Sequence, residues 1–489
     1  MTLWGIKKFF FENANQTQTI IKNTFWLGLA EAISGFLRLV LLIYVARILG
    51  ATEYGKFTFA MAFIMLLASF ADFGLSQTTT RQLVQEGERD YSSIISLRSI
   101  LSMVTIILMV AGSFFITDNY QIRQVIWILG AYMAISNLSE IIFAFFRAHE
   151  KMQYEAWAKI MQAIITTGIG IFLILTFPSV QNLGYSYVFA SIIALIFILL
   201  LFFLRAKVLA IKWDKAIWKK YLLMTWPLGL TAICAGIYTY IDSTMMGAWG
   251  QVIQTGWYNA AYKIICIVLI PSTLISQSFY PVMSRGFKES TEKLQRVFNK
   301  QMKVTIFLGI PLIAGGIILA PQIVNFFYGA SFSPAILAFQ FLIIMAGVIF
   351  ISTVLNQILI VAHQQKKLFL ITFIGAMVNI ILNIMLIPTL SLYGAALSTV
   401  ITYLILLLLA YLFVFRFTKI RPINADISIV ILATIIATTI MSFVLNCPKV
   451  YKMHLSPAVF IGIIVYSLAF LLAKIIENGV ISLNKNVRN

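Results

Sequence analysis

Long apolar runs separated by short polar connectors dominate this chain. We place such runs at 20–46, 57–76, 95–117, 122–146, 154–177, 183–204, 221–247, 256–283, 303–327, 333–362, 367–387, 391–415, 426–446 and 457–476. An α-helix needs about twenty residues to cross roughly 30 Å of hydrocarbon, and most of these runs reach that length. The pattern therefore predicts an all-α polytopic membrane protein with about fourteen transmembrane helices.

The positive charges of the chain gather in alternate connectors. If the N-terminus is cytoplasmic, most of the 36 Lys and Arg residues lie on the inner side, and the few on the outer side are Arg47, Lys56, Arg123, Lys449 and Lys452. Cytoplasmic loops of membrane proteins are enriched in Lys and Arg. The alternation thus predicts an even number of spans, with both termini in the cytoplasm.

The composition agrees with a membrane protein and excludes several other classes. Residues are 61% hydrophobic and 11% charged, whereas a soluble domain carries about 25% charged residues. The net charge of +19 is explained by the basic connectors, so we expect no nucleic-acid partner. Three cysteines and three histidines are scattered along the chain, and their spacing predicts neither a metal site, a disulfide framework nor a cofactor.

A basic amphipathic connector at 205–220 separates the first six runs from the next six. We expect an N-terminal lobe at 1–204, this linker, a C-terminal lobe at 221–415, and two extra helices with a cytoplasmic tail at 416–489. The similar motifs LGATEYGKFTFA and WGQVIQTGWYNAAY follow the first and seventh runs and support two lobes. The first 18 residues lack a cleavage-site pattern, so we expect them to be retained.

Two motifs with a known chemical meaning fail in their context. Residues 50–56, GATEYGK, match most of a phosphate-binding loop, but Phe57 replaces the Ser or Thr that binds magnesium, and a membrane helix replaces the preceding strand. The glycosylation signal at Asn137 falls within the fourth predicted span. With no catalytic triad or aqueous carboxylate pair either, the sequence predicts no enzyme.

Ionisable residues inside spans are informative because each costs about 2.5 to 3.5 kcal/mol at a helix centre. Glu31 and Arg38 are seven residues apart in the first span, which places them on one helix face. They form an ion pair that neutralises itself or joins a neighbouring helix, or they line a hydrated cavity. In the second interpretation Arg38 meets an anionic substrate.

The seventh and eighth spans each carry a polar stripe at helical spacing. Tyr238 and Asp242 belong to the first stripe, and Asn259 and Lys263 belong to the second. The stripes predict facing walls of one cavity, with Lys263 as its cation and Asp242 as its acid. The alternative is a buried Asp242–Lys263 pair that only fixes helix register.

Four further polar residues lie inside spans with a weaker functional signal. Asp72 and Glu140 are candidate acids, but they stand near span ends, where they could simply reach water. Asn379 and Asn383 share a face of the eleventh span, and we interpret them as contacts between packed helices.

Seven segments in this chain resemble one known family in the order of that family. These are ARILGATEYGKFTFA (46–60), ADFGLSQTTTRQL (71–83), FFRAHEKM (145–152), PLGLTAICAGIYTYIDSTMMG (227–247), GWYNAAYKI (256–264), YPVMSR (280–285) and NIILNIMLIPTLSLYGAALST (379–399). They are similar to the polysaccharide flippases, the Wzx-like O-antigen family of the multidrug/oligosaccharidyl-lipid/polysaccharide (MOP) exporter superfamily. The resemblance covers almost the whole chain.

The resemblance implies two six-helix lobes around a central V-shaped cavity, as in the MATE-like MOP fold, plus two C-terminal helices. It implies export of an undecaprenyl-pyrophosphate-linked oligosaccharide across the bacterial inner membrane, with assembly proteins such as a polymerase as further partners. By position, Arg38 and Lys263 would bind the anion, with Asn259 and Tyr238 beside them. Glu31 and Asp242, followed by Asp72 and Glu140, would couple transport to H⁺ or Na⁺.

Other functions remain open from the sequence. A lipid II flippase would also need a cationic cavity. A cation-coupled multidrug exporter of the same superfamily would favour acidic and aromatic cavity groups, which Asp72 and Asp242 could supply. A non-transporting scaffold for polymer assembly would leave the charges inside spans as ion pairs only.

Overall fold

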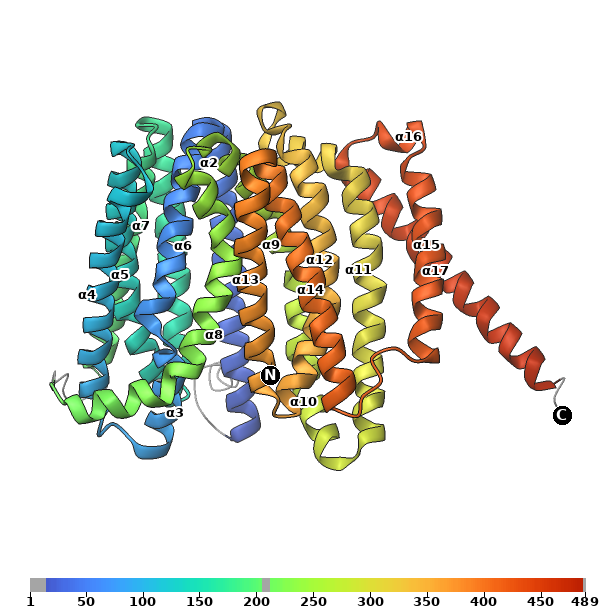
Figure 1. Cartoon of the computed structure of the whole chain (residues 1–489), viewed down its shortest axis with the longest axis horizontal. Helices are drawn as coiled ribbons and strands as arrows, with labels where there is room; N and C mark the ends of the chain where they lie inside the picture. Colours follow the sequence, from blue (N-terminus) through green and yellow to red (C-terminus); the bar gives the residue numbers. More distant parts are fainter. Residues whose placement is uncertain (1–14, 205–211, 487–489) are drawn as a thin grey trace, which may run out of the picture. The chain divides into compact units, whose positions relative to one another are not determined.

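The computed structural model describes residues 15–204 and 212–486, and within these ranges every regular element is a helix (Figure 1). The helices of the first half are α2 (Gln16–Asp72), α3 (Leu75–Glu86), α4 (Tyr91–Ile116), α5 (Tyr120–Ala148), α6 (Met152–Thr176), α7 (Val180–Phe203) and α8 (Lys215–Ala248). Those of the second half are α9 (Val252–Val268), α10 (Ile270–Glu289), α11 (Thr291–Tyr328), the short η1 (Ala330–Phe332), α12 (Ala335–Val361), α13 (Gln365–Leu390), α14 (Leu392–Phe417), α15 (Ala425–Leu445), α16 (Pro448–Tyr451) and α17 (Leu455–Asn486).

The helices have the length and composition of membrane spans. Thirteen segments of the described residues qualify, and the first of them, Gln18–Glu86, contains the first two predicted spans. These two spans are separated at Gly50, whose φ of 74° and ψ of 178° interrupt the 57-residue α2. Without that break α2 would be about 85 Å long, far longer than a bilayer is thick. The all-α polytopic class is confirmed, and this chain is a multi-pass membrane protein.

Two predicted spans are broken where the sequence analysis drew one helix. The second ends at Asp72, and the left-handed residues Phe73 and Gly74 (φ 42° and 75°) redirect the chain into α3. The eighth is divided at Leu269 into α9 and α10, with Pro271 in the first turn of α10. Proline has no N–H to donate and is tolerated in the first turn of a new helix.

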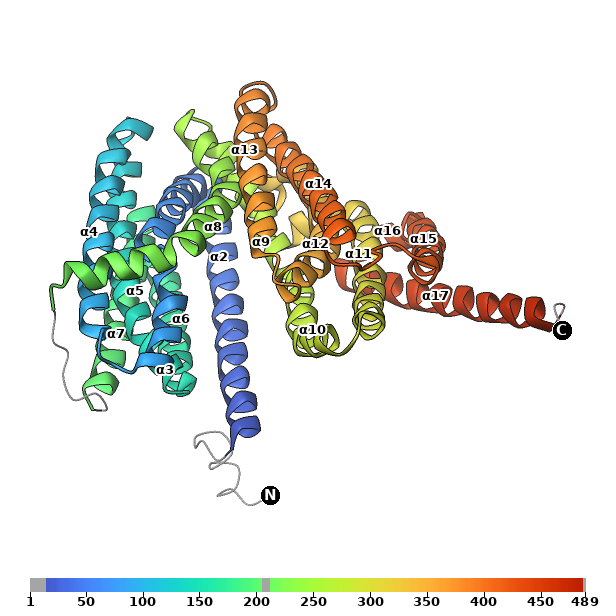
Figure 2. The same cartoon turned by 60° about the horizontal axis from the view of Figure 1, so that its bottom comes forward.

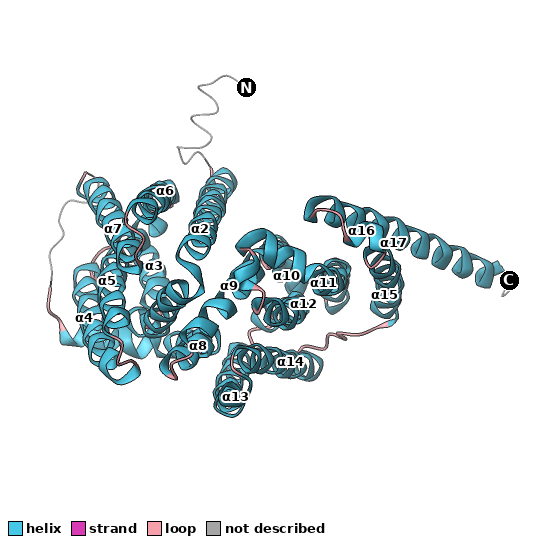
Figure 3. Cartoon of the chain, turned by 90° about the horizontal axis from the view of Figure 1, so that it is seen from above, coloured by secondary structure: helices cyan, strands magenta, loops and turns pink. Residues whose placement is uncertain are grey.

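Packing divides the chain into two units, Met1–Gly256 and Trp257–Asn489. In the first unit α2 packs against α5, α6 and α8, while α7 packs against α5 and α6. In the second, α12 packs against α11 and α14, α13 lies beside α14, and α15 lies beside α17 (Figures 2 and 3). The four-part division expected from the sequence stays a prediction.

The two similar motifs of the sequence contact each other inside the first unit. A Cβ atom at Gly55 would lie 1.9 Å from the carbonyl oxygen of Val252, and one at Gly256 would lie 2.3 Å from that of Ala51. Neither position leaves room for a side chain. Glycine at these places therefore allows the backbones of α2 and α9 to touch.

The first 14 residues and residues 205–211 of the linker lie outside the described residues. The rest of the linker leads directly into α8. Asp214 caps this helix by accepting from the backbone N–H groups of Ala216 and Ile217 at 2.9 and 3.2 Å. Trp218 Nε1 donates to the carbonyl of Ser93 at 2.9 Å, so the start of α8 is fixed against α4.

Candidate functional site

A cavity of about 330 Å³ with polar walls lies within the first unit, among α2, α5, α6 and α7. Three of the predicted site residues line it, namely Glu31 and Arg38 from α2 and Glu140 from α5. The other lining residues are Ser34, Leu41, Tyr132, Ser136, Ser139, Phe143, Lys159, Gln162, Ala163, Thr166, Thr167 and Tyr187. We refer to it as the α2–α6 cavity.

Helical periodicity explains why α2 and α6 present polar walls. Glu31, Ser34 and Arg38 are spaced by three and four residues and therefore share one face of α2. Ser34 Oγ donates to the carbonyl oxygen of Lys159 at 3.3 Å, and Thr167 Oγ1 donates to that of Leu37 at 3.3 Å. These hydrogen bonds fix the two polar faces against each other.

The charges of Glu31 and Arg38 are available at the cavity. Both residues are exposed to it, and neither forms an ion pair with the other or with any described residue. The self-neutralising pair considered above is thus not formed in this conformation. An unpaired guanidinium in a membrane-embedded cavity needs water or an anion, because its charge is costly to hold in hydrocarbon.

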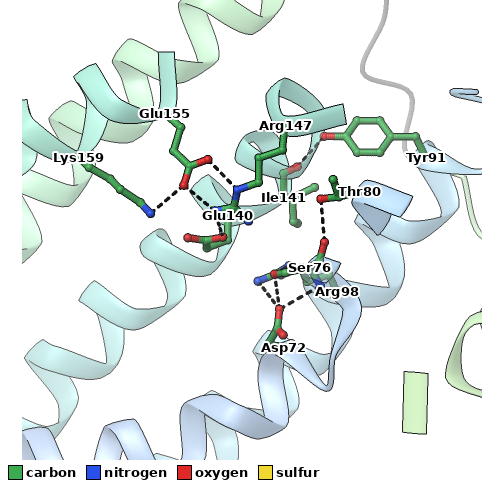
Figure 4. A network of polar contacts seen from close by, with 10 residues as sticks. All are labelled: Asp72, Ser76, Thr80, Tyr91, Arg98, Glu140, Ile141, Arg147, Glu155 and Lys159. Carbon is green, nitrogen blue, oxygen red and sulfur yellow. Dashed lines mark hydrogen bonds and ion pairs between the residues drawn. The ribbon is translucent and has the colours of Figure 1, made fainter. Parts of the chain in front are cut away.

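The acid Glu140 belongs to an ionic network shown in Figure 4. Arg147 Nη2 lies 3.1 Å from Glu140 Oε2 and 2.6 Å from Glu155 Oε1. Lys159 Nζ lies 2.7 Å from the same Glu155 oxygen. The Glu155 side chain is only 1% exposed, so two cations from α5 and α6 compensate one buried carboxylate.

A second ionic cluster holds Asp72 (Figure 4). Arg98 Nη2 lies 2.9 Å from Asp72 Oδ1, and its Nη1 donates to Ser76 Oγ at 2.7 Å. Ser76 Oγ in turn donates to Asp72. Arg98 is 2% exposed. The Asp72 carboxylate therefore joins the end of α2 to α3 and α4, and its proposed role in ion coupling stays a prediction.

The remaining predicted site residues lie on α8 and α9. Tyr238 and the buried Asp242 belong to α8 in the first unit, whereas the buried Asn259 and the half-buried Lys263 belong to the second unit. That Lys263 shares a chamber with Arg38 stays a prediction, as does its pairing with Asp242.

The two asparagines of the eleventh predicted span form a buried contact between helices. Asn383 Nδ2 donates to Asn379 Oδ1 at 3.2 Å, and Ser398 of α14 donates to Asn383. All three side chains are fully buried. The contact agrees with the interpretation that they serve helix packing.

Apart from Glu140, the α5 and α6 walls of the cavity were not predicted from the sequence. Tyr132, Ser136 and Glu140 recur every four residues on α5, and Lys159, Gln162 and Thr166 recur at three and four residues on α6. The same periodicity drew attention to the seventh and eighth spans. Lys159 lies seven residues, about two turns, after the start of α6.

The described residues contain no group of three or more His, Cys, Asp or Glu side chains arranged to hold a metal ion. Transport without a resident metal or cofactor stays a prediction, and H⁺ or Na⁺ would enter only as a coupling ion.

Two family models match different parts of the chain. The model described as "Polysaccharide biosynthesis protein" matches residues 20–287, and the one described as "Lipid II flippase MurJ" matches residues 258–467. A curated relative in Haloferax volcanii, the "Probable low-salt glycan biosynthesis flippase Agl15", is 21% identical over 393 residues, which cover 78% of this chain and 81% of the relative.

Solved structures share the fold. The lipid II flippase MurJ in an inward closed conformation matches with a TM-score of 0.73 and 19% identity, over 93% of this chain and 99% of that one. An inward-facing multidrug resistance MATE family transporter of the MOP superfamily matches with a TM-score of 0.66 and 16% identity, over 82% and 100%. The chain thus has the polytopic membrane fold of the MOP superfamily. Within it, the chain belongs to the polysaccharide biosynthesis protein family, and the resemblance seen in the sequence is confirmed.

Proposed function

We propose that this protein is a flippase that moves an undecaprenyl-pyrophosphate-linked oligosaccharide repeat unit from the cytoplasmic to the outer leaflet. It would work by alternating access in the bacterial plasma membrane, with both termini in the cytoplasm, and would not be an enzyme. Family membership supports the polysaccharide substrate class. The relative in Haloferax volcanii is itself named as a probable flippase.

The unpaired guanidinium of Arg38 in the α2–α6 cavity is the observation that supports the proposal most. A diphosphate cannot cross hydrocarbon without fixed donors, because desolvating its charge is very costly. Arginine binds phosphate oxygens through two parallel hydrogen bonds. The other cation at the cavity, Lys159, already contacts Glu155 at 2.7 Å, so Arg38 is the better candidate to receive the diphosphate.

The remainder of the cavity suits a sugar. Tyr132 and Tyr187 lie with their ring centroids 5.3 Å apart in an edge-to-face arrangement, and Ser136, Gln162 and Thr166 offer hydroxyl and amide groups. Aromatic faces pack against the apolar face of a sugar ring, while hydroxyls and amides pair with sugar hydroxyls. We infer that the first sugar next to the diphosphate contacts this wall.

Transport toward the outer leaflet needs an energy source, and no nucleotide-binding motif supplies one. Glu31 lines the same cavity as Arg38 and forms no ion pair among the described residues. We propose that Glu31 exchanges H⁺ or Na⁺ during the cycle. Asp242 is the other candidate from the sequence, whereas Glu140 and Asp72 are weaker candidates because each contacts an arginine.

A lipid II flippase is the second candidate, and the match of residues 258–467 to the MurJ model favours it. Both substrates carry a polyprenyl diphosphate, so Arg38 would serve either one. The two functions differ in the sugar that is recognised.

The decisive experiment deletes the gene and identifies the lipid-linked glycan that accumulates on the cytoplasmic face. We expect an oligosaccharide repeat unit to accumulate and surface polymer to fall. Accumulation of lipid II would favour the second candidate, and accumulation of neither lipid would contradict both.

Complementation then connects the site to the function. The wild-type gene should restore surface polymer, whereas Arg38→Ala should restore at least about tenfold less, because a charged hydrogen bond to phosphate contributes roughly 1.5 to 3 kcal/mol. Arg38→Lys should retain part of the activity. Lys288→Ala is the matched control, because Lys288 is an exposed cation outside the cavity. All variants should be present in the membrane at equal levels.

A further inference from the structure

A second cavity, of about 520 Å³, lies in the second unit among α10, α11 and the start of α15. Five of its lining side chains are cations, and two are acids. The cations are Arg285, Lys293, Arg296, Lys300 and Lys303, and the acids are Glu289 and Asp426. We refer to it as the α10–α11 cavity.

Both acids of this cavity already face a lysine. Lys293 Nζ lies 2.7 Å from Glu289 Oε2, and Lys303 Nζ lies 3.8 Å from Asp426 Oδ2. Within residues 15–204 and 212–486, the other three cations, Arg285, Arg296 and Lys300, form no ion pair. Five cations and two acids therefore surround one hollow, which leaves an excess of positive charge that would attract a multivalent anion.

The wall of the cavity is built by tertiary contacts rather than by a loose loop. The opposite face of α11 carries Leu294, Phe298 and Met302, which are buried in the core of the second unit. The segment before α15 is held to α11 because Asn424 Nδ2 donates to Asn299 Oδ1 at 3.0 Å. Cations on a helix that is fixed on both sides are preorganised for a ligand.

Exposed apolar side chains lie in the cavity and beside it on α11, and we refer to them as its rim. Val282 lines the cavity and is 43% exposed, and Val304, next to Lys303, is 38% exposed. The long apolar stretch of α11 begins at Val304. A ligand with an anionic head and a hydrocarbon tail can contact both the cations of the cavity and the apolar rim. A soluble anion can contact only the cations.

We propose that the α10–α11 cavity binds the phosphate headgroup of an anionic membrane phospholipid, separately from the lipid that is transported. Arg285, Arg296 and Lys300 contact the phosphate, and Val282 and Val304 contact the first methylene groups of the acyl chains. The enrichment of cations in cytoplasmic connectors does not by itself gather five of them around one hollow. Lys288, in the same hairpin, does not line it.

The test measures lipid retention by native mass spectrometry on the full chain in detergent. Phosphatidylglycerol is titrated into wild type, into the triple variant Arg285→Gln, Arg296→Gln, Lys300→Gln, and into the control double variant Lys288→Gln, Lys366→Gln. We expect wild type and the control to retain the lipid, and the triple variant to bind it at least about tenfold more weakly. Phosphatidylcholine should not be retained.

Each other outcome overturns the proposal. Equal lipid retention by wild type and the triple variant would exclude this cavity as the binding site. If the control double variant lost as much lipid as the triple variant, the loss would reflect the lower net positive charge and not this cavity. Inorganic phosphate is tested in parallel on the melting midpoint of the solubilised protein. A rise as large as that caused by phosphatidylglycerol would identify a soluble phosphate ligand instead of a lipid. Equal midpoints of the ligand-free variants verify that folding is intact.

Discussion

Glu31 and Arg38 illustrate what the position of a single charge means inside a membrane. They are seven residues apart on α2 and line one cavity, yet they form no ion pair with each other. Anion binding at Arg38 changes the electrostatic potential at Glu31. The Arg38 guanidinium and the Glu31 carboxylate can therefore bind the substrate and the coupling ion one after the other. Substrate binding and ion release would then be coupled within one helix face.

This coupling predicts the behaviour of Glu31→Gln. The variant keeps the size of the side chain but can no longer exchange an ion, so transport in reconstituted vesicles should lose its response to an imposed H⁺ or Na⁺ gradient. Substrate binding should persist. Glu292→Gln is the matched control, since Glu292 is exposed in the first turn of α11. An unchanged gradient response in Glu31→Gln would transfer the coupling role to Asp242, which Asp242→Asn would then test.

At the scale of elements, ion pairs decide how the helices of the first unit are joined. The Arg147–Glu155–Lys159 contacts tie α5 to α6, and the Asp72–Arg98 contact ties the end of α2 to α4. A buried pair adds little net stability over an apolar pair, but removing one partner leaves an uncompensated charge. These residues therefore set the arrangement of the helices around the cavity.

Glu155→Gln should lower the free energy of unfolding by about 3 kcal/mol, because Glu155 is buried, Lys159 loses its carboxylate partner and Arg147 keeps only Glu140 among the ion pairs of the described residues. Glu140→Gln should cost about 1 kcal/mol or less, since Glu140 is 31% exposed and has one partner. The measurement is the melting midpoint of each purified variant in the same detergent. Identical midpoints for Glu155→Gln and wild type would show that the network does not hold the helices together.

At the scale of the whole molecule, the sequence predicts that two cations, Arg38 and Lys263, bind one substrate. Arg38 lies in the first unit and Lys263 in the second. Alternating access between two lobes around a central site is the general behaviour of transporters built from repeats. If both cations hold one diphosphate, each contributes to the same binding step.

A double variant tests this cooperation. Arg38→Ala and Lys263→Ala should each reduce surface polymer at least about tenfold, and the combined variant should be little worse than the more severe single one, because residues acting as a unit are not additive. Arg38→Ala combined with Lys288→Ala is the control for two charge removals. Effects that multiply in the combined variant, or normal polymer in Lys263→Ala, would contradict a shared anion site.

The sequence by itself determined the membrane class, the spans and the face shared by Glu31 and Arg38. These are local properties, since each span must satisfy its backbone hydrogen bonds within itself and helical periodicity places residues three, four and seven apart on one face. The distribution of positive charges among the connectors predicts that both termini lie in the cytoplasm, and this stays a prediction. The end of the second predicted span was wrong, because the left-handed residues Phe73 and Gly74 end α2 at Asp72.

Only the tertiary structure decided which charges are compensated and which are available. Because α6 packs against α2, one face of α6 lines the cavity with Lys159, Gln162 and Thr166. Asp72 forms an ion pair because α4 places Arg98 beside it. Such partners come from helices far apart in the chain, and the periodicity of one helix carries no information about the face of another. For that reason the sequence could name the charges within the membrane, while packing alone determined that Arg38 and Glu31 line a cavity without an ion pair to any part of the chain that the structure describes.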